Sequence, residues 1–391
     1  MHILFLTTRI PFPPIGGERL RPFYFIKYLS LKHRITLLSF IEDKKETEKS
    51  KDYLSDSLEI KTVYLPKLNS YLNCVGGLLM PYPLQVSYYK SYLMYKLIRE
   101  QIMREDIDLV FCHLIRMADY LKHIKIKKIL DLSDALSLRY RLSSKYRKGV
   151  FKFIDYLEYK RLKSYEPKIS SYFSLNLVAS EIDSRYFKSM GIKNIYCLPN
   201  GVEIEEDFKE IKSKQSKIIF FANLRAYPNQ DAVIYFYREI FPFIKKELKD
   251  VKLMVVGAQI PNYIYSLFKE DNSVELYPDV ADIKTYIRQA TVSVAPMRIG
   301  VGIQNKILQS MALKVPVVAT TLAKGAIEAE DNKEIIIADK PEGFAKGVII
   351  LLKDKDLRDY IAENAFRLVK EKYLWANIVK DLERICLNLI S

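Results

Sequence analysis

The sequence lacks the phosphate-binding loops that most often mark a nucleotide-dependent protein. No GxGxxG follows a strand-like run, which excludes the usual nicotinamide- or flavin-binding fingerprint, and no GxxxxGK[ST] occurs, which excludes a P-loop. The longest apolar runs, such as KIIFFANL, are strand-length and well short of the roughly 20 residues that cross a bilayer. The opening MHILFLTT has neither a preceding basic stretch nor a small-residue cleavage site, so we expect a first strand rather than a signal peptide.

Cysteine and histidine are scarce as well. The four cysteines show no CxxC spacing, which predicts ordinary buried thiols in a reducing cytoplasm. Only four histidines are present and the sequence has no clustered set of Cys, His and Asp residues, so we do not expect a structural zinc site. A cofactor is not expected either.

Basic residues, in contrast, are plentiful, and the net charge is +15. They are densest at residues 139–168, where ten basic side chains and three acidic ones alternate with tyrosine and phenylalanine. One interpretation is a solvated helical face. The other is a face that rests on anionic phospholipid headgroups, because aromatic rings and Lys/Arg both favour that interface. No RNA-recognition or helix-turn-helix pattern accompanies the charge, so we expect no nucleic-acid partner.

The pattern of apolar runs predicts an α/β protein with two domains. In the first half, short apolar runs from HILFLTT to IYCLP alternate with amphipathic stretches, and the pattern then restarts at KIIFFANL and continues to VPVVAT. Such runs without strict alternation are typical of parallel sheets covered on both faces. We therefore expect two Rossmann-like domains facing each other across a cleft, with a final helix that crosses back to the first domain. The expected division is residues 1–198, a linker at 199–216, residues 217–372, and a C-terminal helix at 373–391.

Three segments carry candidate chemistry, and the first is TTRIPFPPIGGERLRP. Gly16 and Gly17 stand just before an expected helix, where backbone N–H groups can approach a phosphate or a sugar oxygen. Arg19 and Arg21 add positive charge beside this loop. A plain tight turn is the alternative interpretation.

The second segment, DIDLVFCHLIRMADY, ends its predicted strand at His113. At that position a side chain points toward the carboxyl edge of the sheet, where α/β proteins bind ligands. His113 could therefore hydrogen-bond a sugar hydroxyl or help to position an acceptor. A structural histidine is the alternative.

The third segment is APMRIGVGIQNKILQSMA, which is typical of a strand, a glycine turn and a helix that begins near Ile303. An anion at this helix start would meet free N–H groups, the positive end of the helix dipole and Lys306 together. That combination stabilises charge on a leaving diphosphate. Gln309, three residues after Lys306, could bind a ribose diol. A solvated lysine on a packing helix is the alternative.

With these segments, the chain resembles the GT-B-fold glycosyltransferases of family 4 (glycosyl transferases group 1), in particular the bacterial members associated with exopolysaccharide and surface-glycan synthesis. The matching motifs run nearly from end to end. They are PPIGGERLRPFY, MPYPLQVSYY, LDLSDALSLRYR, RLKSYE, LPNGVE, ANLRAYPNQDAVIYF, GVGIQNKILQSMALKVPVVAT and the tryptophan that opens the last helix.

The resemblance implies a retaining, metal-independent hexosyltransferase that takes its sugar from a UDP- or GDP-sugar bound by the second domain. The first domain would bind a glycan or a polyprenyl-diphosphate-linked acceptor, and the protein would be cytoplasmic, with contact to the inner face of the plasma membrane. His113 and Lys306 would be catalytic, and Arg19, Arg21 and His113 would contact the acceptor. The donor would be held by Gly16, Gly17, Asn223, Arg225, Arg298, Gly302, Ile303, Gln304, Lys306 and Gln309.

The chain departs from the family pattern at three places. Val301 and Gln309 occupy the positions of the usual Glu-x7-Glu pair, and a glutamine makes weaker hydrogen bonds than a carboxylate. Asn223 and Pro228 replace the usual arginine and lysine after the first strand of the second domain, and Lys314 replaces a usual glycine. These departures support a second hypothesis, in which the chain is a weakly active or inactive partner subunit that binds glycan or another transferase.

Overall fold

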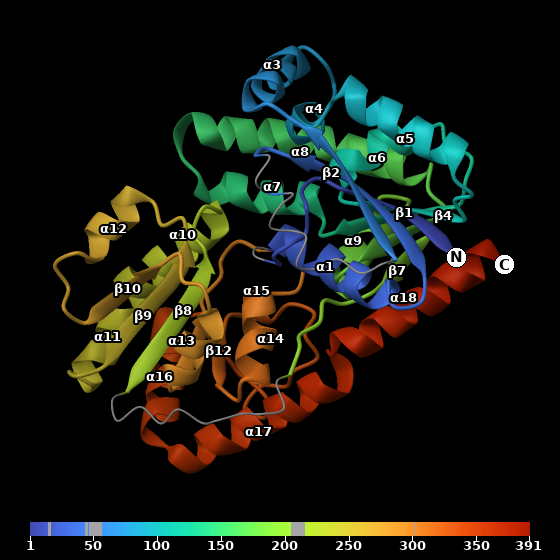
Figure 1. Cartoon of the computed structure of the whole chain (residues 1–391). Helices are drawn as coiled ribbons and strands as arrows, with labels where there is room; N and C mark the ends of the chain where they lie inside the picture. The colour runs from blue at the N-terminus through green and yellow to red at the C-terminus, as the bar shows by residue number, and fades with distance from the viewer. Residues whose placement is uncertain (15–16, 44–45, 47–56, 205–215, 301) are drawn as a thin grey trace. The chain divides into compact units, whose positions relative to one another are not determined.

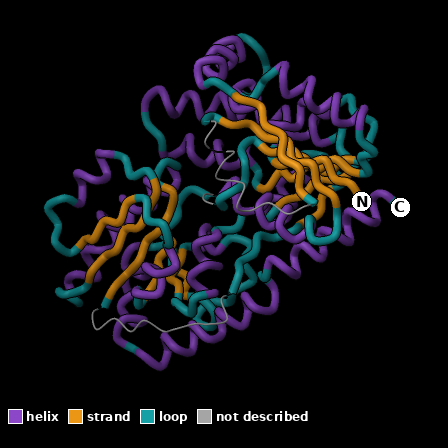
Figure 2. The backbone as a smooth tube through the Cα atoms, in the orientation of Figure 1, coloured by secondary structure: helices purple, strands orange, loops and turns teal. Residues whose placement is uncertain are grey.

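The computed structural model describes residues 1–14, 17–43, 46, 57–204, 216–300 and 302–391. The chain divides into two compact units. The first comprises Met1–Pro199 and Ala376–Ser391, and the second comprises Asn200–Trp375. Each unit contains one sheet of parallel strands (Figure 2). No helix in the described ranges is both long and apolar enough to span a bilayer.

The first unit, coloured blue to green with the red helix α18 in Figure 1, is built on a seven-stranded sheet with the order β3-β2-β1-β4-β5-β6-β7. Its strands are β1 (His2–Thr7), β2 (Arg34–Ile41), β3 (Leu58–Tyr64), β4 (Leu109–His113), β5 (Lys128–Ser133), β6 (Leu175–Val178) and β7 (Ile195–Cys197). Its helices are α1 (Gly17–Leu29), α3 (Lys67–Leu78), α4 (Leu84–Tyr88), α5 (Tyr92–Arg104), α6 (Ile115–Ala118), α7 (Leu136–Tyr146), α8 (Gly149–Ser170), α9 (Glu181–Ser189) and α18 (Trp375–Ile390).

Both faces of this sheet are covered, as its nearly continuous apolar strands require. On one face Leu4 and Val110 pack in a cluster with Ile98 of α5 and Leu162 of α8. On the other face the rings of Phe5 and Phe111 stack at 4.3 Å, and Phe25 of α1 meets Phe111 edge-on at 5.7 Å. The sheet is therefore the middle layer of the unit.

Helix α18 returns to the first unit, as the sequence predicts. Its Glu383 accepts hydrogen bonds from Lys32 Nζ at 2.8 Å and from His33 Nε2 at 3.0 Å, in the turn between α1 and β2. The apolar side of α18 is buried, including Leu382. Because the last helix anchors here, the first unit is made from both ends of the chain.

The second unit contains a six-stranded sheet with the order β10-β9-β8-β11-β12-β13. Its strands are β8 (Lys217–Asn223), β9 (Lys252–Ala258), β10 (Val274–Pro278), β11 (Val292–Ala295), β12 (Val317–Ala319) and β13 (Ile336–Ile337). Its α-helices are α10 (Tyr227–Tyr235), α11 (Phe241–Glu247), α12 (Asn262–Phe268), α13 (Ile283–Gln289), α14 (Asn305–Ala312), α15 (Thr321–Lys324), α16 (Pro341–Lys353) and α17 (Lys355–Lys372). The short β13 is a strand that the apolar runs do not predict.

The predicted fold is confirmed by these two parallel sheets with helices on their faces. In the second unit, Phe220 and Val255 face a core shared with α10 and α16, whereas Ile219 and Met254 face a smaller cluster with Ile287 of α13. Parallel strands gather their carboxyl ends at one edge of a sheet, and in such folds that edge is where ligands bind. The candidate residues are therefore located relative to that edge in each unit.

Candidate functional site

His113 is the last residue of β4 and is almost completely buried, with 1% of its surface exposed. Its Nδ1 lies 2.8 Å from Oδ2 of Asp131, and its Nε2 lies 3.0 Å from the carbonyl oxygen of Glu18. The geometry thus holds the His113 ring between β5 and the first turn of α1.

Asp131 connects His113 to Arg21. The Arg21 Nε lies 3.0 and 2.9 Å from the two carboxylate oxygens, and Arg21 Nη1 donates to the Pro199 carbonyl at 3.1 Å. Burial alone would raise the pKa of Asp131, but Arg21 and His113 outweigh it and the pKa is lowered. Arg21 is 1% exposed, which indicates a structural role. The predicted contact with an acceptor would need an exposed side chain.

A second ion cluster lies beside this network and was not predicted from the sequence. Glu18 accepts from Arg116 Nη1 at 2.7 Å and lies 3.6 Å from Arg9 Nε, and Arg9 also pairs with Glu42 at 2.7 Å. Burial raises the pKa of Glu18, yet the two arginines outweigh that effect and lower it. These side chains keep some contact with water at the carboxyl ends of β1 and β4, where an acceptor could reach them.

The glycine loop is only partly described. Gly16 lies outside the described residues, and Gly17 is the first residue of α1. Arg19, in the first turn of α1, lies 3.6 Å from Glu46. Their proposed contacts with phosphate or acceptor stay predictions.

In the second unit, Lys306 lies in the first turn of α14 and has neutral neighbours. Its Nζ is 3.0 Å from Asn229 Oδ1, 3.6 Å from Met297 Sδ and 4.9 Å from the centre of the Phe220 ring. Desolvation lowers the pKa of Lys306 to about 7. The residue keeps part of its surface in contact with water. A cation in this setting gains most from an anionic ligand, which would supply the missing counter-charge.

The loop before α14 differs from the prediction in one respect. The helix begins at Asn305 rather than near Ile303, because Gly302 has a φ of 71° and Gln304 is an extended N-cap residue. The Gln304 amide nitrogen lies 3.2 Å from where a Cβ on Gly300 would be. The Ile307 N–H donates to the Gln304 carbonyl at 2.9 Å, so the N–H groups open to a ligand at the helix start are those of Asn305 and Lys306, one turn before Gln309.

Three further predicted donor residues follow the other strands. Asn223 ends β8, where its carbonyl and side-chain oxygens accept from Asn229 Nδ2 at 2.8 Å and from the Arg225 backbone N–H at 3.0 Å. The Arg225 side chain is exposed. Arg298 binds both oxygens of Asp231, at 3.0 and 2.6 Å, and its guanidinium lies 4.3 Å from the centre of the Tyr235 ring. Asn229, which was not among the predicted donor residues, donates to the Asn223 carbonyl and accepts from Lys306.

Within the part of the chain that the structure describes, no three His, Cys, Asp or Glu side chains are grouped as metal ligands. The sheet edges instead carry the cations Arg9, Arg116 and Lys306, each with hydrogen-bonding neighbours. Arginine and lysine in such places bind phosphate and carboxylate.

Comparison with known proteins agrees with this architecture. Residues 215–354 match the family model described as glycosyl transferases group 1. An uncharacterized 44.6 kDa protein in the cps region of Klebsiella pneumoniae is 24% identical over 385 residues, covering 95% of this chain and 96% of its own. The uncharacterized glycosyltransferase MJ1069 of Methanocaldococcus jannaschii is 23% identical over 257 residues, which covers 62% of this chain and 61% of that protein.

Solved structures share the fold at low sequence identity. The Anabaena protein Alr3699/HepE, crystallised with UDP and glucose, superposes with a TM-score of 0.70 at 15% identity, over 99% of this chain and 100% of that one. The sucrose-phosphate synthase of Thermosynechococcus elongatus gives a TM-score of 0.74 at 12% identity, over 100% and 99% of the two chains. The architecture is the GT-B type.

The family match lies in the second unit, and it agrees with the family that the motifs predict.

Proposed function

We propose that the chain is a retaining hexosyltransferase that uses a UDP- or GDP-sugar and needs no metal ion or other cofactor. Lys306 is the observation that carries the proposal. It is a largely desolvated cation with neutral partners at the start of an α-helix, at the carboxyl edge of a parallel sheet. A diphosphate is the ligand that satisfies a lysine and a helix N-terminus together.

The same arrangement supports the chemistry of transfer. When the bond between sugar and phosphate breaks, negative charge grows on the departing diphosphate. The Lys306 side chain and the N–H groups of Asn305 and Lys306 would face that charge without having to reorganise, which is the kind of electrostatic stabilisation that contributes most in enzymes. Gln309, one turn along α14, would hydrogen-bond the ribose. Charge stabilisation by Lys306 is its proposed catalytic role.

The first unit is proposed to bind the acceptor, a glycan or a polyprenyl-diphosphate-linked glycan. Arg9 and Arg116 would contact it, because they are charged, partly exposed and held by Glu18. His113 has both ring nitrogens engaged, so we assign it a positioning role through the Glu18 carbonyl. Two comparisons support a glycan context: a relative encoded in a cps region, and a structural neighbour crystallised with UDP and glucose.

We further propose that the protein works in the cytoplasm at the inner face of the plasma membrane. In α7 and α8 the acidic residues Asp155, Glu158 and Glu166 are buried, whereas most of the lysines are exposed. The outward side of these helices is therefore more basic than the sequence count suggests, which suits an anionic surface.

A thermal-shift panel of UDP- and GDP-sugars tests the donor proposal. Wild-type protein should be stabilised by at least one nucleotide, because a ligand that binds only the folded state raises the melting temperature. Lys306→Ala should lose that stabilisation, and Lys353→Ala, at an exposed lysine of the same unit, should keep it. Absence of stabilisation by every nucleotide would remove the donor site.

One alternative is an inactive partner subunit, and Gln309 is the observation that favours it. A glutamine in the place of the family's acid weakens ribose binding. In that case no nucleotide sugar would be hydrolysed or transferred, and the Gln309→Glu variant would bind nucleotide more tightly than the wild type does. An active enzyme instead turns over at least one donor with Gln309 in place.

A further inference from the structure

Helix α3 of the first unit has the reverse of the usual amphipathic arrangement. Its large apolar side chains recur every three or four residues and point outward, and they are joined by the residues just after the helix. All are more than half exposed: Leu68, Tyr71, Leu72, Val75, Leu78, Leu79 and Met80, with Leu79 at 92%. A helix on a globular protein normally places this stripe against the core.

The buried side of α3 is made of small residues instead. Ser70 and Gly77 are its buried residues, and a Cβ on Gly77 would lie 2.6 Å from Ser87 Oγ of α4. The close approach of α3 to α4 thus fixes which side faces inward. The apolar stripe is held outward by packing and is not a consequence of a loosely attached helix.

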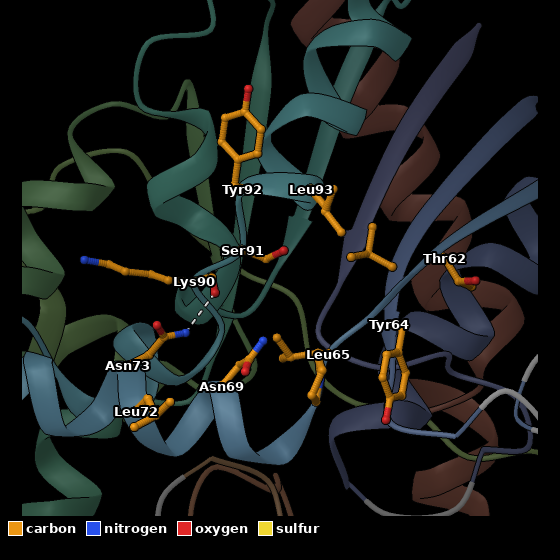
Figure 3. Close-up of a pocket in the computed structure, with 12 residues that line it drawn as sticks. Thr62, Tyr64, Leu65, Asn69, Leu72, Asn73, Lys90, Ser91, Tyr92 and Leu93 are labelled. Atoms are coloured by element: carbon orange, nitrogen blue, oxygen red, sulfur yellow. Dashed lines mark hydrogen bonds between the residues drawn. The ribbon is translucent and has the colours of Figure 1, made fainter.

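The apolar surface continues from α3 toward the start of α5. A groove of about 620 Å³ lies between them (Figure 3), with Leu72 and Leu93 on its two sides and Tyr64 and Tyr92 at its rim. Asn73 Nδ2 donates to the Lys90 carbonyl at 2.9 Å and ties the two sides together. Tyrosine rings beside exposed leucines are typical of a surface at a membrane interface, where one end of the ring is apolar and the other is wet.

Charge around this surface is mainly positive, although Lys67 also lies 3.6 Å from Glu42. The sequence contains no aspartate or glutamate between Glu59 and Glu100, and Lys67 and Lys90 are exposed beside the stripe. Arg161 of α8 donates to the Leu78 carbonyl at 2.8 Å, so the end of α3 is attached to the helix whose outward side is basic. An outward apolar stripe bordered mainly by cations complements an anionic lipid surface.

We infer that α3 and the residues following it insert into the headgroup–acyl boundary of an anionic phospholipid bilayer. Leu79 and its apolar neighbours enter the acyl region, and Lys67 and Lys90 contact the headgroups. This inference deepens the proposed membrane location by naming the inserting element. It rests on the surface of the first unit and not on the donor chemistry of the second.

Tryptophan fluorescence tests the insertion directly, because the chain has one tryptophan, Trp375, which is 1% exposed and gives a constant background. A Leu79→Trp variant should shift its emission to the blue with phosphatidylcholine–phosphatidylglycerol vesicles and be quenched by brominated lipid. The matched control is Leu31→Trp in the turn after α1, where the leucine is 73% exposed, and its emission should not shift. Equal behaviour of the two reporters would overturn the inference.

Vesicle sedimentation gives the second readout. Leu79→Glu should bind phosphatidylglycerol-containing vesicles at least about tenfold more weakly than wild type. Burial of one leucine side chain contributes about 1.5–3 kcal/mol, and about 1.4 kcal/mol already corresponds to a tenfold change in affinity. Leu31→Glu should bind like the wild type, and phosphatidylcholine vesicles should bind wild type more weakly. Both positions are exposed, so neither variant should fail to fold.

Two other outcomes would also overturn the inference. If light scattering shows a dimer that Leu79→Glu dissociates, while vesicles do not bind, the stripe is covered by a second copy of the chain. If vesicles bind neither the wild type nor Leu79→Glu, α3 does not insert. Nucleotide-sugar stabilisation of the same samples separates this failure from a failure of the proposed function.

Discussion

Replacing Lys306 with methionine removes a positive charge whose burial lowers the free energy of unfolding of the protein. Methionine keeps most of the length and apolar contact of the lysine stem, so the change mainly deletes the ammonium group. Desolvation lowers the pKa of Lys306 from 10.5 to about 7, and each pKa unit corresponds to about 1.4 kcal/mol. The full shift would be about 5 kcal/mol in a dry site. Because Lys306 keeps contact with water, we expect roughly 1–2 kcal/mol.

The pH dependence follows from the sign of the shift. The folded-state pKa lies below the unfolded value, so the unfolded chain binds more protons between the two values and stability rises with pH there. The cost of burying Lys306 is complete below about pH 7 and decreases as the pH rises toward 10.5. Lys306→Met should therefore be more stable than wild type at pH 6, by roughly 2–6 °C in melting temperature, and the gain should shrink at pH 9.

Differential scanning calorimetry without ligand measures this difference. Lys353→Met is the control, since Lys353 is an exposed lysine of the same unit that lies 3.5 Å from Glu247. Its melting temperature should match the wild type within the error at both pH values. A Lys306→Met variant that is less stable than wild type, or whose difference does not change with pH, would refute the account of Lys306 as an uncompensated cation.

Three further predictions concern the packing within the two units, and the melting temperature of each variant is the measurement that checks them. Asp131→Ala leaves the buried Arg21 guanidinium without its counter-ion and the His113 ring without its hydrogen-bond partner, and it should cost about 3–5 kcal/mol; an unchanged melting temperature would mean that the network adds nothing. Gly257→Ala places a Cβ 2.8 Å from the Ala222 carbonyl oxygen and should cost about 1–3 kcal/mol. The control is Gly343→Ala inside α16, where the nearest atom lies 3.8 Å from the new Cβ, and it should be neutral or stabilising by about 0.5–1 kcal/mol. A larger loss of stability in Gly343→Ala than in Gly257→Ala would contradict the packing. Leu382→Ala in buried α18 should cost about 2–5 kcal/mol and Leu387→Ala, 45% exposed, little, so equal losses would show that α18 is not part of the first unit.

The sheets could be predicted from the sequence because their strands are short apolar runs separated by helical stretches. Twelve such runs correspond to β1–β12. The exception is β13, which has only two residues, Ile336 and Ile337, and pairs with β12 through tertiary packing rather than any local pattern. The start of α14 was misplaced for a local reason, since the positive φ of Gly302 delays the helix by two residues.

The partners of the candidate residues were harder to predict. His113 was placed correctly at a strand end, but its neighbour Asp131 lies on β5, and only the register of the two strands brings them opposite each other. Arg21 was read as a loop cation because proximity to the glycines suggests a ligand, whereas the fold turns it toward Asp131. Pairings between distant segments have no signature in a single sequence.

The burial of some charged side chains in the first unit could have been predicted by projecting the sequence onto a helix. Glu158 and Glu166 share a helical face with Leu162, so their spacing indicates burial rather than a mixed surface charge. In α3 the apolar spacing indicates a buried stripe, and the sequence alone gives the opposite of what the structure shows. The inward side is decided by the close contact of Gly77 with α4, which is a tertiary effect.

The most direct test of the central claim is the release of nucleoside diphosphate from a panel of UDP- and GDP-sugars, followed with membrane lipid extract as the acceptor source. The account predicts that wild-type protein releases UDP or GDP from at least one donor, that extract accelerates the release, and that Lys306→Ala loses most of the rate while Lys353→Ala keeps it. No release from any donor, or a normal rate in Lys306→Ala, would contradict a donor site built around Lys306.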